Sequence, residues 1–196
     1  MKNFKKLKVS LLVAALALFS FAAVNQFVYN VDNAHSRIGF TITHLGISDF
    51  NGQFDKYETK ITGTKADFSD AIFEFSADAA SINTFNSNRD EHLRSEDFFN
   101  TDKFEKLKFK STSVVAMRDN KFEIIGDLTM HGITKSVVLN AIHVGNFENP
   151  KSKKTSSGFK ITGTVKRSDF GVGAGFAAPM LSDEVQLIAN LEFVRD

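Results

Sequence analysis

The chain has 196 residues, with 24 basic and 23 acidic side chains, and 42% of its residues are hydrophobic. This is the composition of a folded globular protein and excludes disorder over most of the length. The absence of cysteine excludes disulfide bonds, thiol catalysis and thiolate metal sites. The 21 Phe, against 2 Tyr and no Trp, indicate a large dry interior, because the Phe ring carries no polar group.

The N-terminal segment has the three parts of a secretory signal. Four lysines within the first eight residues precede the apolar run Leu11–Phe19 and the small-x-small sequence Ser20-Phe21-Ala22. We therefore predict a signal peptide over residues 1–22, a single domain over 23–196, and a periplasmic or secreted protein. An uncleaved membrane anchor is the alternative, but the apolar stretch that ends at Val24 is short for a membrane span.

Removal of this leader changes the charge of the protein. Because the leader contains four lysines and no acidic residue, its loss takes the formal net charge from +1 to −3. A mildly acidic domain lacks the basic face that the phosphates of nucleic acid require, so nucleic acid is not an expected partner. We also expect no stable membrane insertion after cleavage, and a homodimer is compatible with this composition.

Alternating apolar and polar residues dominate the rest of the chain. This period of two is typical of half-buried strands with one face toward a core. Counted with two segments near 28–33 and 52–62, the rows predict eight or nine antiparallel strands, which usually close into a sandwich or an up-and-down barrel. The apolar rows lie, in chain order, within residues 38–44, 73–79, 107–109, 122–128, 137–141, 159–165 and 185–193.

One stretch departs from this alternation. Ser87–Phe99 follows a good N-cap residue and has acidic residues early, which predicts a helix of about three turns across one end of a barrel. The segment Asn146–Ser157, with Pro150 and several lysines, predicts a solvated hairpin loop. Gly39, Gly126 and Gly163 interrupt the bulky inward rows and suit a curved wall, although the pattern alone leaves a filled core and a cavity both open.

A set of motifs resembles the YceI family of exported, lipocalin-like bacterial proteins, over about Tyr29 to Phe193. Two departures are visible: Glu105 follows Phe104 where the family usually has an aromatic-proline pair, and Tyr29 lies near the place of a common Trp. The motifs are Asp32-x-x-His35-Ser36-x-Ile38-x-Phe40-x-x-x-His44-Leu45-Gly46, Gly52-x-Phe54, Ser81-Ile82-Asn83-Thr84, Arg89-Asp90-x-His92-Leu93, Asp97-Phe98-Phe99, Phe109-x-Ser111, Gly126-Asp127-Leu128-Thr129-x-His131-Gly132-Ile133-Thr134-Lys135, Arg167-Ser168-Asp169-Phe170-Gly171 and Asp183-Glu184-Val185.

The resemblance implies an all-β, eight-stranded or slightly larger antiparallel lipocalin-like barrel with one helix across an end. It also implies a lumen that holds a long apolar ligand, such as a polyisoprenoid or another long-chain amphiphilic lipid. The histidines lack the spacing of metal ligands and no catalytic motif occurs, so no cofactor, metal or catalytic residue is expected. The side chains expected to line the lumen are Ile38, Phe40, Ile42, His44, Phe73, Phe75, Phe109 and Leu128.

Polar residues of these motifs are candidates for a ligand head group. Arg89, His92 and Arg167 carry donors that suit an anionic group, and the competing interpretation is that they tie the helix and turns together by internal hydrogen bonds. An alternative function is an enzyme with an apolar substrate that uses His44, Asp90 or His92 for acid–base chemistry. A third interpretation is a structural domain with a filled core.

Overall fold

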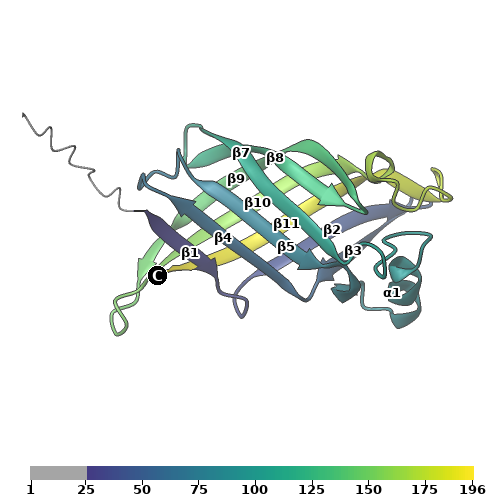
Figure 1. Ribbon diagram of the computed structural model, residues 1–196, viewed down its shortest axis with the longest axis horizontal. Coiled ribbons are helices and arrows are strands. Elements are labelled where there is room, and N and C mark those ends of the chain that lie inside the picture. Colours follow the sequence, from purple (N-terminus) through teal and green to yellow (C-terminus); the bar gives the residue numbers. More distant parts are fainter. Residues whose placement is uncertain (1–25) are drawn as a thin grey trace, which may run out of the picture.

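The computed structural model describes residues 26–196, so the predicted signal peptide lies outside the described residues. Within them the chain forms eleven β-strands, one α-helix and two 3-10 helices (Figure 1). The elements are β1 (Phe27–Val31), β2 (Arg37–His44), β3 (Ser48–Phe54), β4 (Tyr57–Gly63), β5 (Ile72–Asp78), η1 (Ala79–Ser81), β6 (Ile82–Asn83), α1 (Ser87–Arg94), β7 (Lys106–Ala116), β8 (Lys121–Met130), β9 (Ile133–Glu148), β10 (Thr155–Lys166), η2 (Arg167–Phe170) and β11 (Leu181–Arg195).

Eight of the strands close into an antiparallel barrel. Their order is β1-β4-β5-β7-β8-β9-β10-β11, and β11 pairs with β1 to complete the ring. The inward residues of β8 and β10 follow the alternation in the sequence, for example Ile124 and Phe159, which are each 1% exposed. The prediction of an all-β barrel with one helix at an end is confirmed.

A second set of strands extends the wall at the helix end. One edge of the long strand β11 pairs with two strands in succession. Its C-terminal part, Phe193–Arg195, pairs with β1, and its earlier part, Val185–Asn190, pairs with β2. β3 and β6 continue the sheet from β2. Figure 1 shows β2, β3 and α1 at the same end of the barrel and the C-terminus near the other end.

Two predicted boundaries are wrong. The single strand expected near 52–62 is two strands, because the chain leaves β3 at Phe54 and turns through Asp55 and Lys56 into β4. Gln53 and Asn83 donate hydrogen bonds to Asp55 at 2.6 and 2.9 Å. β3 belongs to the strands that extend the sheet beyond the barrel, whereas β4 belongs to the barrel wall beside β1. β3 and β4 therefore do not pair with each other.

The helix is shorter than predicted. The Asn86 side chain caps its N-terminus by accepting a bond from the Arg89 amide at 3.1 Å. The helix stops at Arg94, because Ser95 has an extended backbone and donates from both its amide and its hydroxyl to the carbonyl of His92. Turns then carry Phe98 and Phe99 toward the barrel.

No helix within residues 26–196 has the length and apolar character needed to cross a membrane.

The barrel interior is packed at the end away from α1. We call this region the packed end; its buried aromatic residues are Phe27, Tyr29, Phe68, Phe159 and Phe193. Phe68 lies edge-on to Phe27 and to Phe159, with ring centroids 5.5 and 5.2 Å apart. Such edge-on pairs stabilise the fold beyond the area that they bury. The rings fill this end of the barrel, which forms the hydrophobic core.

Glycine allows two inward rings to lie flat against the wall. A Cβ atom on Gly52 of β3 would lie 2.3 Å from the Phe40 ring, and one on Gly126 of β8 would lie 2.5 Å from the Phe109 ring. Both distances are far shorter than a van der Waals contact, so only glycine fits under these rings. The rings therefore lie against the wall and leave open the space that they face.

Candidate functional site

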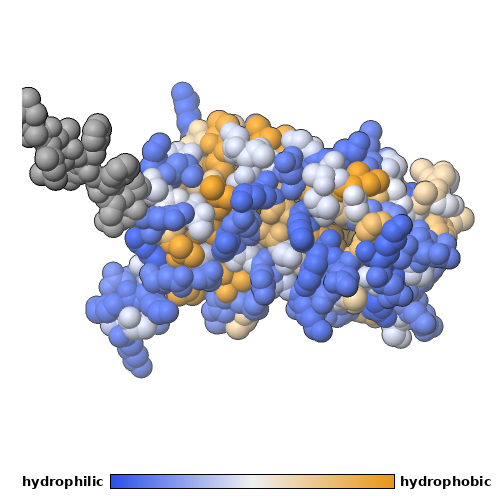
Figure 2. All heavy atoms as spheres, viewed as in Figure 1, coloured by the Kyte–Doolittle hydropathy of each residue, from blue (hydrophilic) through white to orange (hydrophobic). Residues whose placement is uncertain are grey.

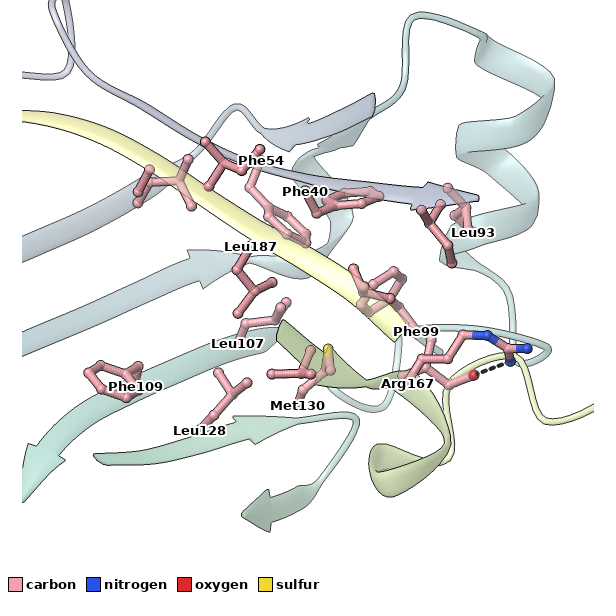
Figure 3. A pocket seen from close by; sticks show the side chains of 18 of the residues that line it. Phe40, Phe54, Leu93, Phe99, Leu107, Phe109, Leu128, Met130, Arg167 and Leu187 are labelled. Atoms are coloured by element: carbon pink, nitrogen blue, oxygen red, sulfur yellow. Dashed lines mark hydrogen bonds between the residues drawn. The ribbon is translucent and has the colours of Figure 1, made fainter. Parts of the chain in front are cut away.

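A cavity of about 550 Å³ occupies the half of the barrel nearer α1 (Figure 3). Its lining is almost entirely apolar, and Figure 3 shows Phe40, Leu107 and Leu187, from three different strands, pointing into the same space. Pockets for small ligands typically have volumes of about 300–1,000 Å³. By contrast, the molecular face in Figure 2 is mostly hydrophilic, with hydrophobic residues in smaller groups. This half of the barrel is therefore hollow, which contradicts the interpretation of a wholly filled core.

The eight predicted lumen residues all line this cavity. They are Ile38, Phe40, Ile42, His44, Phe73, Phe75, Phe109 and Leu128. They come from β2, β5, β7 and β8, which form different parts of the wall. The contact of each residue with a ligand stays a prediction.

Several lining residues lie outside the predicted set. Phe50 and Phe54 lie on the same face of β3, but the single strand expected over 52–62 does not include Phe50. Phe98 and Phe99, predicted as the end of the helix, lie in the turns after it and line the cavity. Phe176 lies in the loop between η2 and β11, where no periodicity exists to reveal it.

The cavity reaches solvent at the end near α1. We call this opening the mouth; its lining residues are His44, Arg89, His92, Phe176 and Met180. The exposed side chains of His92 and Met180 belong to the lining, so the cavity is open here. Phe176 stacks on Phe98 with ring centroids 4.8 Å apart, which holds the loop over this end.

Arg89 is the cation of the mouth. Its Nε donates to the Thr84 hydroxyl at 2.7 Å and its Nη2 to the Thr84 carbonyl at 2.7 Å. The guanidinium also lies 4.6 Å from the centre of the Phe50 ring. Among the described residues no carboxylate forms an ion pair with Arg89. Its remaining N–H groups are therefore available to an anionic head group.

Arg167 is engaged differently, although it also touches the cavity. The side chain is 7% exposed, and its N–H groups donate to the carbonyl oxygens of Val172, Gly173, Phe176, Leu181 and Ser182. Figure 3 marks one of these bonds. A guanidinium has five N–H donors, so none remains for a ligand. The geometry therefore favours the interpretation that Arg167 ties the loop together by internal hydrogen bonds, and not that it binds a head group.

The histidines of the mouth have protein partners. The His92 Nε2 lies 3.0 Å from the Asp97 carboxylate, and both side chains are about half exposed or more. His44 packs edge-on against Phe50, with ring centroids 5.3 Å apart. Both histidines also line the cavity at the mouth, and their contact with a ligand head group stays a prediction.

Of the three acid–base candidates, His44 and His92 line the mouth and Asp90 does not. The Asp90 carboxylate accepts from the Thr84 amide at 2.8 Å and from the Thr84 hydroxyl at 2.5 Å. These bonds hold Thr84, whose hydroxyl and carbonyl oxygens accept from Arg89, so Asp90 is linked to the arginine through Thr84. Within residues 26–196 no three His, Asp or Glu side chains gather in the way that a metal ion requires.

The fold and the cavity define a class of protein: an extended antiparallel barrel with a hollow, apolar lumen and a polar mouth. A family model described as YceI-like domain matches residues 29–193, and the chain belongs to the YceI-like family. The resemblance found in the motifs is thereby confirmed.

Relatives and solved structures agree with this assignment. A UPF0312 protein of Staphylococcus aureus strain N315 is 36% identical over 169 residues, which cover 84% of this chain and 96% of the relative. The Campylobacter jejuni YCEI protein is 33% identical, with a TM-score of 0.71 over 84% of this chain and 95% of its own. A polyisoprenoid binding domain from Saccharophagus degradans has the same fold at 16% identity, with a TM-score of 0.62 over 84% of this chain and 97% of its own.

Proposed function

We propose that this chain holds one long apolar molecule, a polyisoprenoid or a similar lipid, in its cavity for carriage, storage or sequestration. The observation that carries the proposal is the almost wholly apolar lining of a 550 Å³ cavity within a closed barrel. The description of the Saccharophagus degradans neighbour as a polyisoprenoid binding domain supports the ligand class.

The energetics of such a site come from the tail. Burial of apolar carbon gains about 0.8 kcal/mol per CH₂ group. Ordering a flexible chain and immobilising it offset much of that gain, so each added isoprene unit contributes about 1–2 kcal/mol net. No charged anchor is needed for tight binding, and polar groups at the mouth choose the head group.

Calorimetric titration of the mature protein with prenyl alcohols tests this function. Affinity is expected to increase from geraniol to farnesol to geranylgeraniol, and to stop increasing when the cavity is full. Equal affinity for all three alcohols, or no binding of any, would overturn the proposal, because an apolar lumen must respond to tail length.

We also propose that the protein is exported, and that it works in the periplasm or outside the cell. The basic and apolar leader within residues 1–22 supports this location. The intact mass of the exported protein should correspond to a chain that begins at Ala23 or within a few residues of it. Recovery of the full-length chain in the membrane fraction would contradict export as a cleaved protein.

Arg89 should discriminate between head groups. Replacing it by Ala is expected to weaken binding of geranylgeranyl diphosphate by about 1.5–3 kcal/mol, because charge-assisted hydrogen bonds are lost, and to change the affinity for geranylgeraniol much less. Arg89→Lys keeps the charge and should retain part of the preference for the diphosphate. Equal losses for the two ligands would make Arg89 a purely structural residue.

A further inference from the structure

The cavity stops inside the barrel, although the strands continue. On β10, Ile161 lines the cavity, whereas Phe159, two residues earlier on the same face, does not. On β11, Leu191 lines the cavity and Phe193 does not. Phe159 and Leu191 are direct partners across these strands. The inner limit of the cavity therefore lies at the level of Phe159.

Phe159 is the centre of the ring cluster at this limit. Its ring centroid lies 5.2 Å from that of Phe68, 6.0 Å from that of Phe193 and 5.0 Å from that of His143. Phe73, which does line the cavity, lies edge-on to Phe159 at 5.6 Å. Phe159 is thus the ring that separates the hollow half from the packed end.

The packed end is closed from outside by Phe68. This residue belongs to the loop between β4 and β5, has a φ of 59° and is 3% exposed. The Asp70 carboxylate holds the loop by accepting from the Thr64 amide and hydroxyl, and these bonds lower the pKa of Asp70 below its usual value. A bulky residue with positive φ persists only where its surroundings fix it. Because Phe68 and Phe159 are buried and do not line the cavity, the cavity does not extend to this end of the barrel.

We propose that Phe159, with Phe73 above it, is the specificity-determining floor of the cavity and sets the longest apolar tail that the barrel accepts. The inference rests on the proposed function, since it assigns a length limit to the ligand of that same site. A tail that enters at the mouth passes Phe40 and Leu187 and ends against Phe73. Further isoprene units have to remain outside, where they gain no burial.

Binding of the prenyl alcohol series to floor variants tests this proposal. In Phe159→Ala, the space left by the ring joins the cavity, and the affinity for the first alcohol that is too long for the unmodified protein should increase about tenfold. Phe147→Ala is the matched control, because Phe147 is 62% exposed on the neighbouring strand β9 and does not line the cavity. It should leave the length limit unchanged.

Ala189→Phe tests the floor from the opposite direction and does not depend on the stability of Phe159→Ala. Ala189 lines the cavity on β11, one inward position above Leu191. A ring there fills the inner part of the cavity, so the length limit should move to a shorter alcohol, with about tenfold weaker binding of the longest alcohol that previously fitted.

The outcomes separate this proposal from the function on which it rests. If the unmodified protein shows no dependence on tail length, the proposed function itself fails. If its affinity increases to a limit, but folded Phe159→Ala and Ala189→Phe both keep that limit, only the floor is overturned. A limit that shifts in opposite directions in the two variants supports it.

Discussion

Arg167→Ala is expected to lower the free energy of unfolding by about 3 kcal/mol or more, since hydrogen bonds to a charged group contribute about 1.5–3 kcal/mol each and a buried acceptor left without a donor costs about 1–3 kcal/mol. The arginine donates to five carbonyl oxygens in the loop between η2 and β11 and at the start of β11. Its removal leaves those of Val172 and Gly173, both buried, without this donor.

Urea unfolding of Arg167→Ala and Arg167→Lys measures this effect. Lysine keeps the charge but offers fewer donors in a different geometry, so it should recover only a small part of the loss. Because the loop carries Phe176 over the mouth, the alanine variant should also release a bound prenyl alcohol faster. A loss below about 1 kcal/mol in Arg167→Ala, the size of one ordinary neutral hydrogen bond, would contradict the structural role.

Phe40→Asp is expected to abolish ligand binding and to destabilise the fold by several kcal/mol, because a carboxylate in an apolar lumen loses its hydration. Phe40 lies on the cavity wall, over Gly52 and 6.1 Å from the Phe54 ring, measured between centroids.

Phe40→Leu is the matched control for this substitution. Leucine keeps an apolar side chain in the lumen, so the variant should fold and bind farnesol with a modest loss of affinity. Circular dichroism and calorimetry report the two effects separately. If Phe40→Asp folded as the parent does and still bound farnesol, the charged side chain would have to lie outside the lumen, against the register of β2 with β11.

The barrel was predictable because inward and outward residues alternate along most of each strand; register shifts at Ser111/Ser113, Gly158/Phe159 and Leu181/Val185 interrupt the pairing only locally. Inward positions such as Ile38 and Phe109 follow from a period of two, and a one-residue shift would place every apolar side chain on the outer face. The break between β3 and β4 was missed because it is only two residues long. The early end of α1 was missed because it depends on Ser95, whose backbone conformation and bonds to His92 are not visible in a hydrophobic pattern.

The division of the interior could not be predicted. Phe159 and Ile161 share one face of one strand, yet the first packs against other rings and the second lines the cavity. The difference comes from Phe68, a residue of a loop without periodicity that enters the barrel end. Whether Arg89 or Arg167 is available to a ligand likewise depends on carbonyl and hydroxyl partners that only the folded chain brings together.

Native mass spectrometry of the protein isolated from the cells that produce it tests whether the barrel holds a lipid. We expect the protein to carry one long apolar molecule per chain, recovered by solvent extraction as a polyisoprenoid or a similar lipid. After the lipid has been extracted and farnesol is added, the parent protein should take up one equivalent and Phe40→Asp none. A parent protein that is isolated without a lipid and takes up no farnesol at saturating concentration would contradict a ligand-holding barrel.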